Sequence, residues 1–117
     1  MEKSIVFQKA YAFSIKVVIT YQILQSDKKE YILSKQFLRS GTSIGPNIAE
    51  ANGAISKADF SAKMSIAYKE SLETKYWVSL LKDTDFIDKE TSISLLKDVD
   101  KISRILFSIL KSTRIKN

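Results

Sequence analysis

Apolar residues recur every three or four positions along most of this chain, the spacing of residues that share one face of an α-helix. In the first segment this spacing continues far beyond the length of a β-strand, so its β-branched run at residues 15–21 is interpreted as helix. The pattern predicts four helical segments, at residues 4–24, 29–52, 56–82 and 89–113, with a turn at 25–29 and a loop at 83–88.

The second segment contains the only proline of the chain, Pro46. Proline cannot donate a backbone hydrogen bond, and its ring crowds the preceding helical turn. The helix therefore either kinks between Gly41 and Pro46 or breaks and restarts there. Because the apolar register continues through Pro46, we expect a kink. Residues 52–53, Asn-Gly, are a credible helix stop, and Ser56 is a credible N-cap for the third helix.

The connections between these segments are only a few residues long, which forces neighbouring helices to run antiparallel. The fourth segment carries the regular apolar seam of a packed bundle, formed by Leu95, Val99, Ile102, Leu106 and Ile109. A chain of 117 residues suits one domain with its own core. We therefore predict one all-α domain spanning residues 1–117, folded as an antiparallel up-down-up-down four-helix bundle.

The first predicted helix is apolar on two sides. One apolar row suits the core of a small bundle, but a second row lies beside it, formed by Ile5, Ala12, Ile15, Ile19 and Ile23. Scattered exposed apolar residues are normal on protein surfaces. A whole row favours burial against another subunit, so we predict that these five residues form an oligomer interface.

The composition removes the common kinds of active site. The chain has no cysteine and no histidine, which excludes disulfides, thiolate metal sites and histidine chemistry. Gly41–Gly45 superficially resembles a phosphate loop, but Pro46 and Asn47 stand where its lysine and hydroxyl residue should follow. Glu70 and Glu73 have the spacing of a carboxylate metal site without its histidines. We expect no catalytic residue, metal, cofactor or enzymatic activity.

The expected location is the cytoplasm. Residues 1–10 lack the features of a signal peptide, and no apolar run reaches the length of a membrane span. A chain without cysteines is compatible with a reducing compartment. We therefore expect no membrane partner.

A polar row accompanies the apolar face of the second predicted helix. Its members share one side of a continuous helix and are Arg39, Ser43, Asn47 and Glu50. On the third helix, Glu73 shares a side with apolar residues, so it is expected to be partly buried and to need a partner such as Arg39. The row is either a structural network that sets helix pairing or subunit register, or a ligand-binding site.

A basic stripe lies on the fourth predicted helix, opposite its apolar seam. It consists of Lys97, Lys101, Arg104 and Lys111. The net charge of +6 makes nucleic acid or another acidic partner plausible, because lysine and arginine supply most non-specific affinity for phosphate. A solvated helix face accounts equally for such a stripe. As a phosphate-binding surface it is expected to have little sequence preference.

Three stretches of the chain resemble the bacterial four-helix-bundle proteins that are also known as 23S rRNA intervening-sequence proteins. The signature lies at residues 33–51, LSKQFLRSGTSIGPNIAEA. Residues 56–60, SKADF, and residues 69–77, KESLETKYW, are similar to the family's third helix. The resemblance covers nearly the whole chain, and its motifs are specific in combination.

The resemblance implies a bacterial four-helix bundle that assembles into a ring-like homo-oligomer, a pentamer. Members are encoded within intervening sequences of rRNA genes, and no enzymatic activity is established for them. A related branch binds nucleic acid and a reverse transcriptase, so RNA or DNA and a reverse transcriptase are the partners that the resemblance implies. The family's polar positions correspond to Arg39, Asn47, Glu50 and Glu73.

One segment departs from the family's pattern. Many members carry a Gly-rich basic turn after the position of Glu50, whereas residues 51–56 of this chain read ANGAIS. This turn is therefore not expected to add basic contacts.

Overall fold

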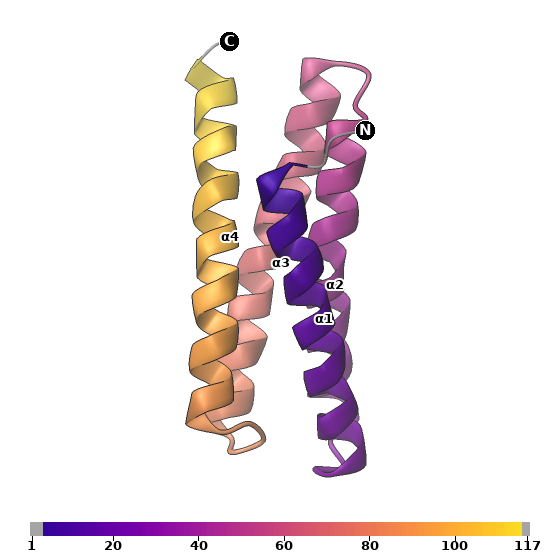
Figure 1. The fold of residues 1–117 in the computed structure, drawn as a ribbon, viewed down its shortest axis with the longest axis vertical. Helices are drawn as coiled ribbons and strands as arrows, with labels where there is room; N and C mark the ends of the chain where they lie inside the picture. Colours follow the sequence, from indigo (N-terminus) through magenta and orange to yellow (C-terminus); the bar gives the residue numbers. More distant parts are fainter. Residues whose placement is uncertain (1–3, 116–117) are drawn as a thin grey trace.

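The computed structural model describes residues 4–115, with side chains for residues 4–113, and contains four helices in that range. They are α1 (Ile5–Ser26), α2 (Leu33–Asn52), α3 (Lys57–Asp83) and α4 (Lys89–Ile115). Each helix packs on two neighbours, so α1 lies diagonally across from α3 and α2 across from α4. The start of α1, the end of α4 and the connection from α2 to α3 lie at one end of the elongated bundle (Figure 1). The predicted up-down-up-down four-helix bundle is confirmed.

One apolar row of each helix forms a shared core. The predicted seam of α4 is buried, apart from Ile109, which is half-buried at its margin. The largest fully buried side chains include Phe13, Phe37, Ile44, Met64 and Leu106. Burial of each side chain of this size contributes roughly 1.5–3 kcal/mol, which makes the core the main source of stability.

Small hydroxyl side chains link the helices inside this core. The hydroxyl of Thr74 on α3 donates to Ser40 on α2 at 3.0 Å, and Ser103 on α4 donates to Ser71 on α3 at 2.8 Å. Among the described side chains, no buried nitrogen or oxygen lacks a hydrogen-bond partner. Small residues therefore allow close helix approach without leaving polar groups unsatisfied.

The start of α2 corrects the sequence-based prediction. The helix begins at Leu33 rather than near Lys29. Lys29 has a left-handed backbone with φ 55°, which is incompatible with an α-helix. The carboxylate of Glu30 then accepts hydrogen bonds from the backbone N–H groups of Ile32, Leu33 and Ser34, at 2.6–3.1 Å. These bonds satisfy the free N–H groups of the first helical turn, so the connection is longer than the apolar pattern predicts.

Helix α2 continues through Pro46, so the alternative of a break at this residue is wrong. The carboxamide of Asn47 donates to the carbonyl oxygen of Ser43 at 2.9 Å, one turn earlier. The side chain of Asn47 thus supplies an extra hydrogen-bond donor next to Pro46, which has no backbone N–H to donate. The predicted stop and cap are present, because α2 ends at Asn52 and the hydroxyl of Ser56 accepts from the backbone N–H of Asp59 at 3.0 Å.

Helices α1 and α2 approach each other closely at Gly41. A Cβ atom built on Gly41 would lie 2.8 and 2.9 Å from the two methyl carbons of Val17, which is fully buried. Valine has a stiff side chain that cannot rotate away at low cost. A residue without a side chain is therefore required here for packing, although Gly41 lies inside a helix.

We predict that Gly41→Ala destabilises the protein by about 1 kcal/mol, because overpacking of roughly 2 kcal/mol outweighs a gain in helix propensity of about 1 kcal/mol. Gly53→Ala is the control. The backbone φ of Gly53 is −102°, and a Cβ atom built on it would have its nearest contact at 3.8 Å, with the carbonyl oxygen of Glu50. This control should be neutral or slightly stabilising. Urea unfolding monitored by circular dichroism measures both, and equal stability of the two variants would contradict the prediction.

Candidate functional site

The polar row of α2 contacts α3 through Arg39. The guanidinium of Arg39 donates to both carboxylate oxygens of Glu70 at 3.2 Å and also to Glu73. The indole N–H of Trp77 donates to the same Glu73 oxygen at 2.9 Å. The structure therefore brings Arg39 and Glu73 together, the partners considered from the sequence, and adds Glu70 and Trp77 to them.

The other members of the row do not converge with Arg39. The hydroxyl of Ser43 and the carboxamide of Asn47 donate to carbonyl oxygens of their own helix. The carboxylate of Glu50 pairs with Lys63 of α3 at 2.9 Å. The row therefore splits into two ion-pair sites at different heights of the α2–α3 interface, separated by side chains that bond locally.

The electrostatics of the Arg39 cluster suit a structural role. Hydrogen bonds from Trp77 and then from Arg39 lower the pKa of Glu73, although partial burial opposes this effect. Hydrogen bonds to Glu73 and Glu70 raise the pKa of Arg39. Both carboxylates are thus occupied by donors within the chain. Among the described residues, no cluster of three acidic side chains has the arrangement of a metal site.

Sequence reasoning missed Glu70, Trp77 and Lys63 as members of these sites. The four-residue spacing from Glu73 to Trp77 indicates that the two side chains can meet on one helix. No comparable signal identifies Lys63, because its contact with Glu50 depends on how α2 and α3 are aligned.

The basic stripe lies on the outer surface of α4. Lys97, Lys101 and Lys111 are exposed, and none of them makes an ion pair within the described part of the chain. Arg104 is the most exposed of the side chains in ion pairs, at 81%, and pairs with Asp100 at 2.8 Å. The structure therefore brings all four predicted residues onto one solvent-facing side, with three free ammonium groups.

The second apolar row of α1 faces outward. Ile5, Ile15, Ile19 and Ile23 are 48–70% exposed, and Ala12 is also exposed. Tyr11 and Val18, absent from the prediction, extend this face and line a groove of about 300 Å³ with Ile15 and Ile19. We name these seven residues the outer face of α1.

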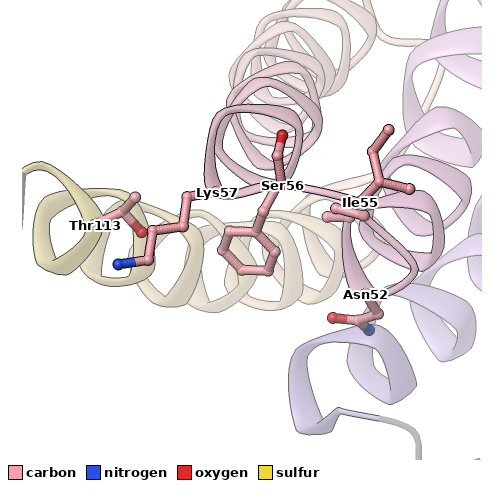
Figure 2. Close-up of a pocket in the computed structure, with 8 residues that line it drawn as sticks. Asn52, Ile55, Ser56, Lys57 and Thr113 are labelled. Atoms are coloured by element: carbon pink, nitrogen blue, oxygen red, sulfur yellow. The ribbon is translucent and has the colours of Figure 1, made fainter.

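A cavity of about 450 Å³ opens at the end of the bundle where α2 leads into α3. Its lining comes from the last residues of α2, the connection, the first turn of α3 and Thr113 of α4. Figure 2 shows Thr113 and Lys57 on one side of this cavity and Asn52 and Ile55 on the other. The sequence contains no signal for it, because three separate helices build its walls.

Comparison with known proteins identifies the relatives of this bundle. The family model of the 23S rRNA-intervening sequence protein matches residues 2–108. The chain belongs to this family. A crystal structure of a Bacteroides thetaiotaomicron protein of unknown function, from the S23 ribosomal protein family, is similar, with 46% identity and a TM-score of 0.90. The match covers 92% of this chain and 99% of that one, whereas no curated protein matches.

Membership of the 23S rRNA-intervening sequence protein family confirms the resemblance seen at residues 33–51 and agrees with the observed fold. The matched region contains both ion-pair sites between α2 and α3 and most of the basic stripe. In the described part of the chain, no helix is long and apolar enough to cross a membrane.

We predict that the fluorescence of Trp77, the only tryptophan, reports the protonation of Glu73. The pKa of Glu73 is lowered in the folded protein from its ordinary value of 4.5. The stabilising contacts of the charged carboxylate are therefore fully present above pH 4.5, and they are lost as the pH falls through the lowered pKa of the folded state. Trp77 emission should therefore change in this acidic range while circular dichroism stays helical.

The control for this titration is Glu70→Gln, because Glu70 contacts Arg39 but not Trp77. Glu73→Gln should remove the acidic fluorescence change, and Glu70→Gln should retain it. An unchanged titration in Glu73→Gln would show that another group controls Trp77 emission.

Proposed function

We propose that this chain is a non-enzymatic cytoplasmic protein that assembles with copies of itself and associates with RNA or DNA through basic surfaces. The exposed row of lysines on α4, without acidic partners in the described chain, is the observation that carries the nucleic-acid part. The outer face of α1 supports assembly. Membership of the 23S rRNA-intervening sequence protein family agrees with a role beside RNA.

The outer face of α1 is unusual for a surface helix. Helix α1 contains no acidic residue and only two lysines, and one of them, Lys16, pairs with Asp98 at 2.6 Å. Its exposed isoleucines would form a contiguous apolar patch on a monomer, which favours aggregation. Covering about four such side chains contributes several kcal/mol before the costs of association.

The opposite side of the bundle also carries exposed apolar side chains. Helix α3, diagonally across from α1, exposes Ile66, Leu72 and Tyr76, each at 41–60%. Exposed apolar side chains on two sides of one protomer suit head-to-tail contacts, in which the outer face of α1 of each copy covers the α3 side of the next. Such contacts close into rings when the rotation between copies allows it. This arrangement is compatible with the proposed pentamer.

We predict that Ile15→Lys or Ile19→Lys dissociates the assembly and leaves the helical circular dichroism largely intact. A charged side chain would be buried without a partner in the interface, whereas both positions are about half exposed in the protomer. Ile93→Lys on α4 is a matched control, because Ile93 is 54% exposed and Ile19 53%. Light scattering that gives the 13.3 kDa monomer mass for the wild type at micromolar concentration would refute assembly.

The basic stripe can hold a phosphate backbone. Lys97, Lys101, Arg104 and Lys111 face solvent along one side of α4, so a nucleic acid can reach them without rearrangement of the bundle. Binding of this kind releases counterions, depends strongly on salt and has little sequence preference.

We predict that the wild-type protein binds rRNA fragments and random duplexes at low salt. The double variant Lys97→Glu with Lys101→Glu should bind about tenfold more weakly or worse, and its binding should depend less on salt, because phosphate contacts are lost. The control is Lys28→Glu with Lys89→Glu, which changes the net charge by the same amount just after the end of α1 and at the start of α4. This control should bind nearly as well as the wild type. No gel shift of either nucleic acid by the wild type would refute nucleic-acid association.

A protein-interaction scaffold is the second candidate. The observation that favours it is an exposed groove between α3 and α4, lined by Leu72, Phe107 and Tyr68 among others. A reverse transcriptase is the protein partner proposed by analogy within the family. Recovery of that partner by the purified wild type, together with no binding of nucleic acid at low salt, would favour the scaffold.

A further inference from the structure

Acidic residues are distributed unevenly along the bundle. We define the basic half as residues 4–14, 43–69 and 101–113, which surround the start of α1, the connection from α2 to α3 and the end of α4 (Figure 1). This half holds seven lysines and arginines but only two acidic residues, Glu50 and Asp59. The other ten acidic residues of the described side chains lie in the opposite half. The excess positive charge is therefore concentrated at one end.

Most of the cations in the basic half have no acidic partner. Lys63 pairs with Glu50, and Arg104 pairs with Asp100. The remaining five make no ion pair within the described residues, and they are Lys9, Lys57, Lys69, Lys101 and Lys111. Free ammonium groups at one end of a protein attract an anionic partner to that end.

The cavity at this end combines apolar and polar walls. Phe60 and Ile55 line it together with the polar side chains of Asn52, Ser56 and Thr113. Its volume of about 450 Å³ lies within the range of pockets that hold small molecules. The cavity can therefore accept a planar group that has both an apolar face and hydrogen-bonding edges, such as a nucleobase.

The cavity lies on a different face of α4 from the basic stripe. The stripe runs about 21 Å along the outer face from Lys97 to Lys111, whereas Thr113 at the cavity wall is two residues, or about 200°, further around the helix than Lys111. Lys57 lies at the same wall as Thr113 (Figure 2). The cation that can hold a phosphate beside the cavity is therefore Lys57, which lies close to the aromatic ring of Phe60 in the lining.

We propose that a single-stranded nucleic acid binds this end of the bundle, with a phosphate on Lys57 and one unstacked base in the cavity against Phe60. This inference rests on the proposed function. A duplex fits less well, because its bases are stacked inside the helix and cannot enter a pocket without being extruded. Aromatic side chains accept every base, so this contact requires no particular sequence.

The experiment measures fluorescence anisotropy with a labelled 12-nucleotide RNA, either single-stranded or as a blunt duplex. Phe60→Leu retains apolar volume at a half-buried position but removes the aromatic face. We expect this variant to bind the single strand about tenfold more weakly, which corresponds to the loss of one stacked base, and to bind the duplex like the wild type.

Lys57→Glu tests the phosphate contact at the cavity, and Lys35→Glu is its matched control. Both lysines are exposed, unpaired within the described chain and in the first turn of a helix, but Lys35 lies in the opposite half. We expect Lys57→Glu to weaken single-strand binding at least fivefold and to lower its salt dependence, and Lys35→Glu to bind within twofold of the wild type.

The outcomes separate this inference from the proposed function. If the wild type binds RNA and neither Phe60→Leu nor Lys57→Glu differs from Lys35→Glu, the cavity is not the site and only this inference fails. Equal loss of single-strand and duplex binding in Phe60→Leu also overturns it, because a stacked base would affect the single strand alone. If the wild type binds neither RNA, the proposed function fails first.

Discussion

The packing of α2 between α1 and α3 sets the geometry on which every surface of this protein depends. On one side, Gly41 lets the α2 backbone approach Val17 too closely for any side chain. On the other side, Ser40 meets Thr74 in the core while Arg39 reaches two glutamates at the surface. Steric fit and paired polar groups together fix the rotation and height of α2 relative to both neighbours.

This arrangement decides which side chains are left outside. With one row of α1 committed to the core, its second row must face solvent or another subunit, because α1 has only two helical neighbours. In the same way, α4 buries its apolar seam and presents its lysines outward. The two candidate surfaces therefore follow from a single core, one apolar and suited to a second copy, the other basic and suited to phosphate.

The ion-pair sites show which contacts helical spacing predicts and which it does not. Spacing along a helix places Arg39 and Glu50 on one side of α2 and indicates that Glu73 needs a partner. It does not reveal that Glu70 shares Arg39 or that Lys63 meets Glu50, because those contacts depend on the alignment of two helices. These ion pairs lie at the surface, so each contributes little to the free energy of unfolding. Their main effect is to select the alignment of α2 with α3.

The sequence by itself determined the number of helices, their core rows, the cap at Ser56, the stop at Asn52 and the outward apolar and basic rows, because all of these arise from residues close together in the chain. Only the tertiary structure decided the late start of α2, the pairing of Arg39 with Glu70 and of Glu50 with Lys63, and the cavity at the basic end. The start of α2 depends on a left-handed backbone at Lys29 that periodicity does not encode. The ion pairs and the cavity join residues from different helices, and their proximity exists only once the bundle has packed.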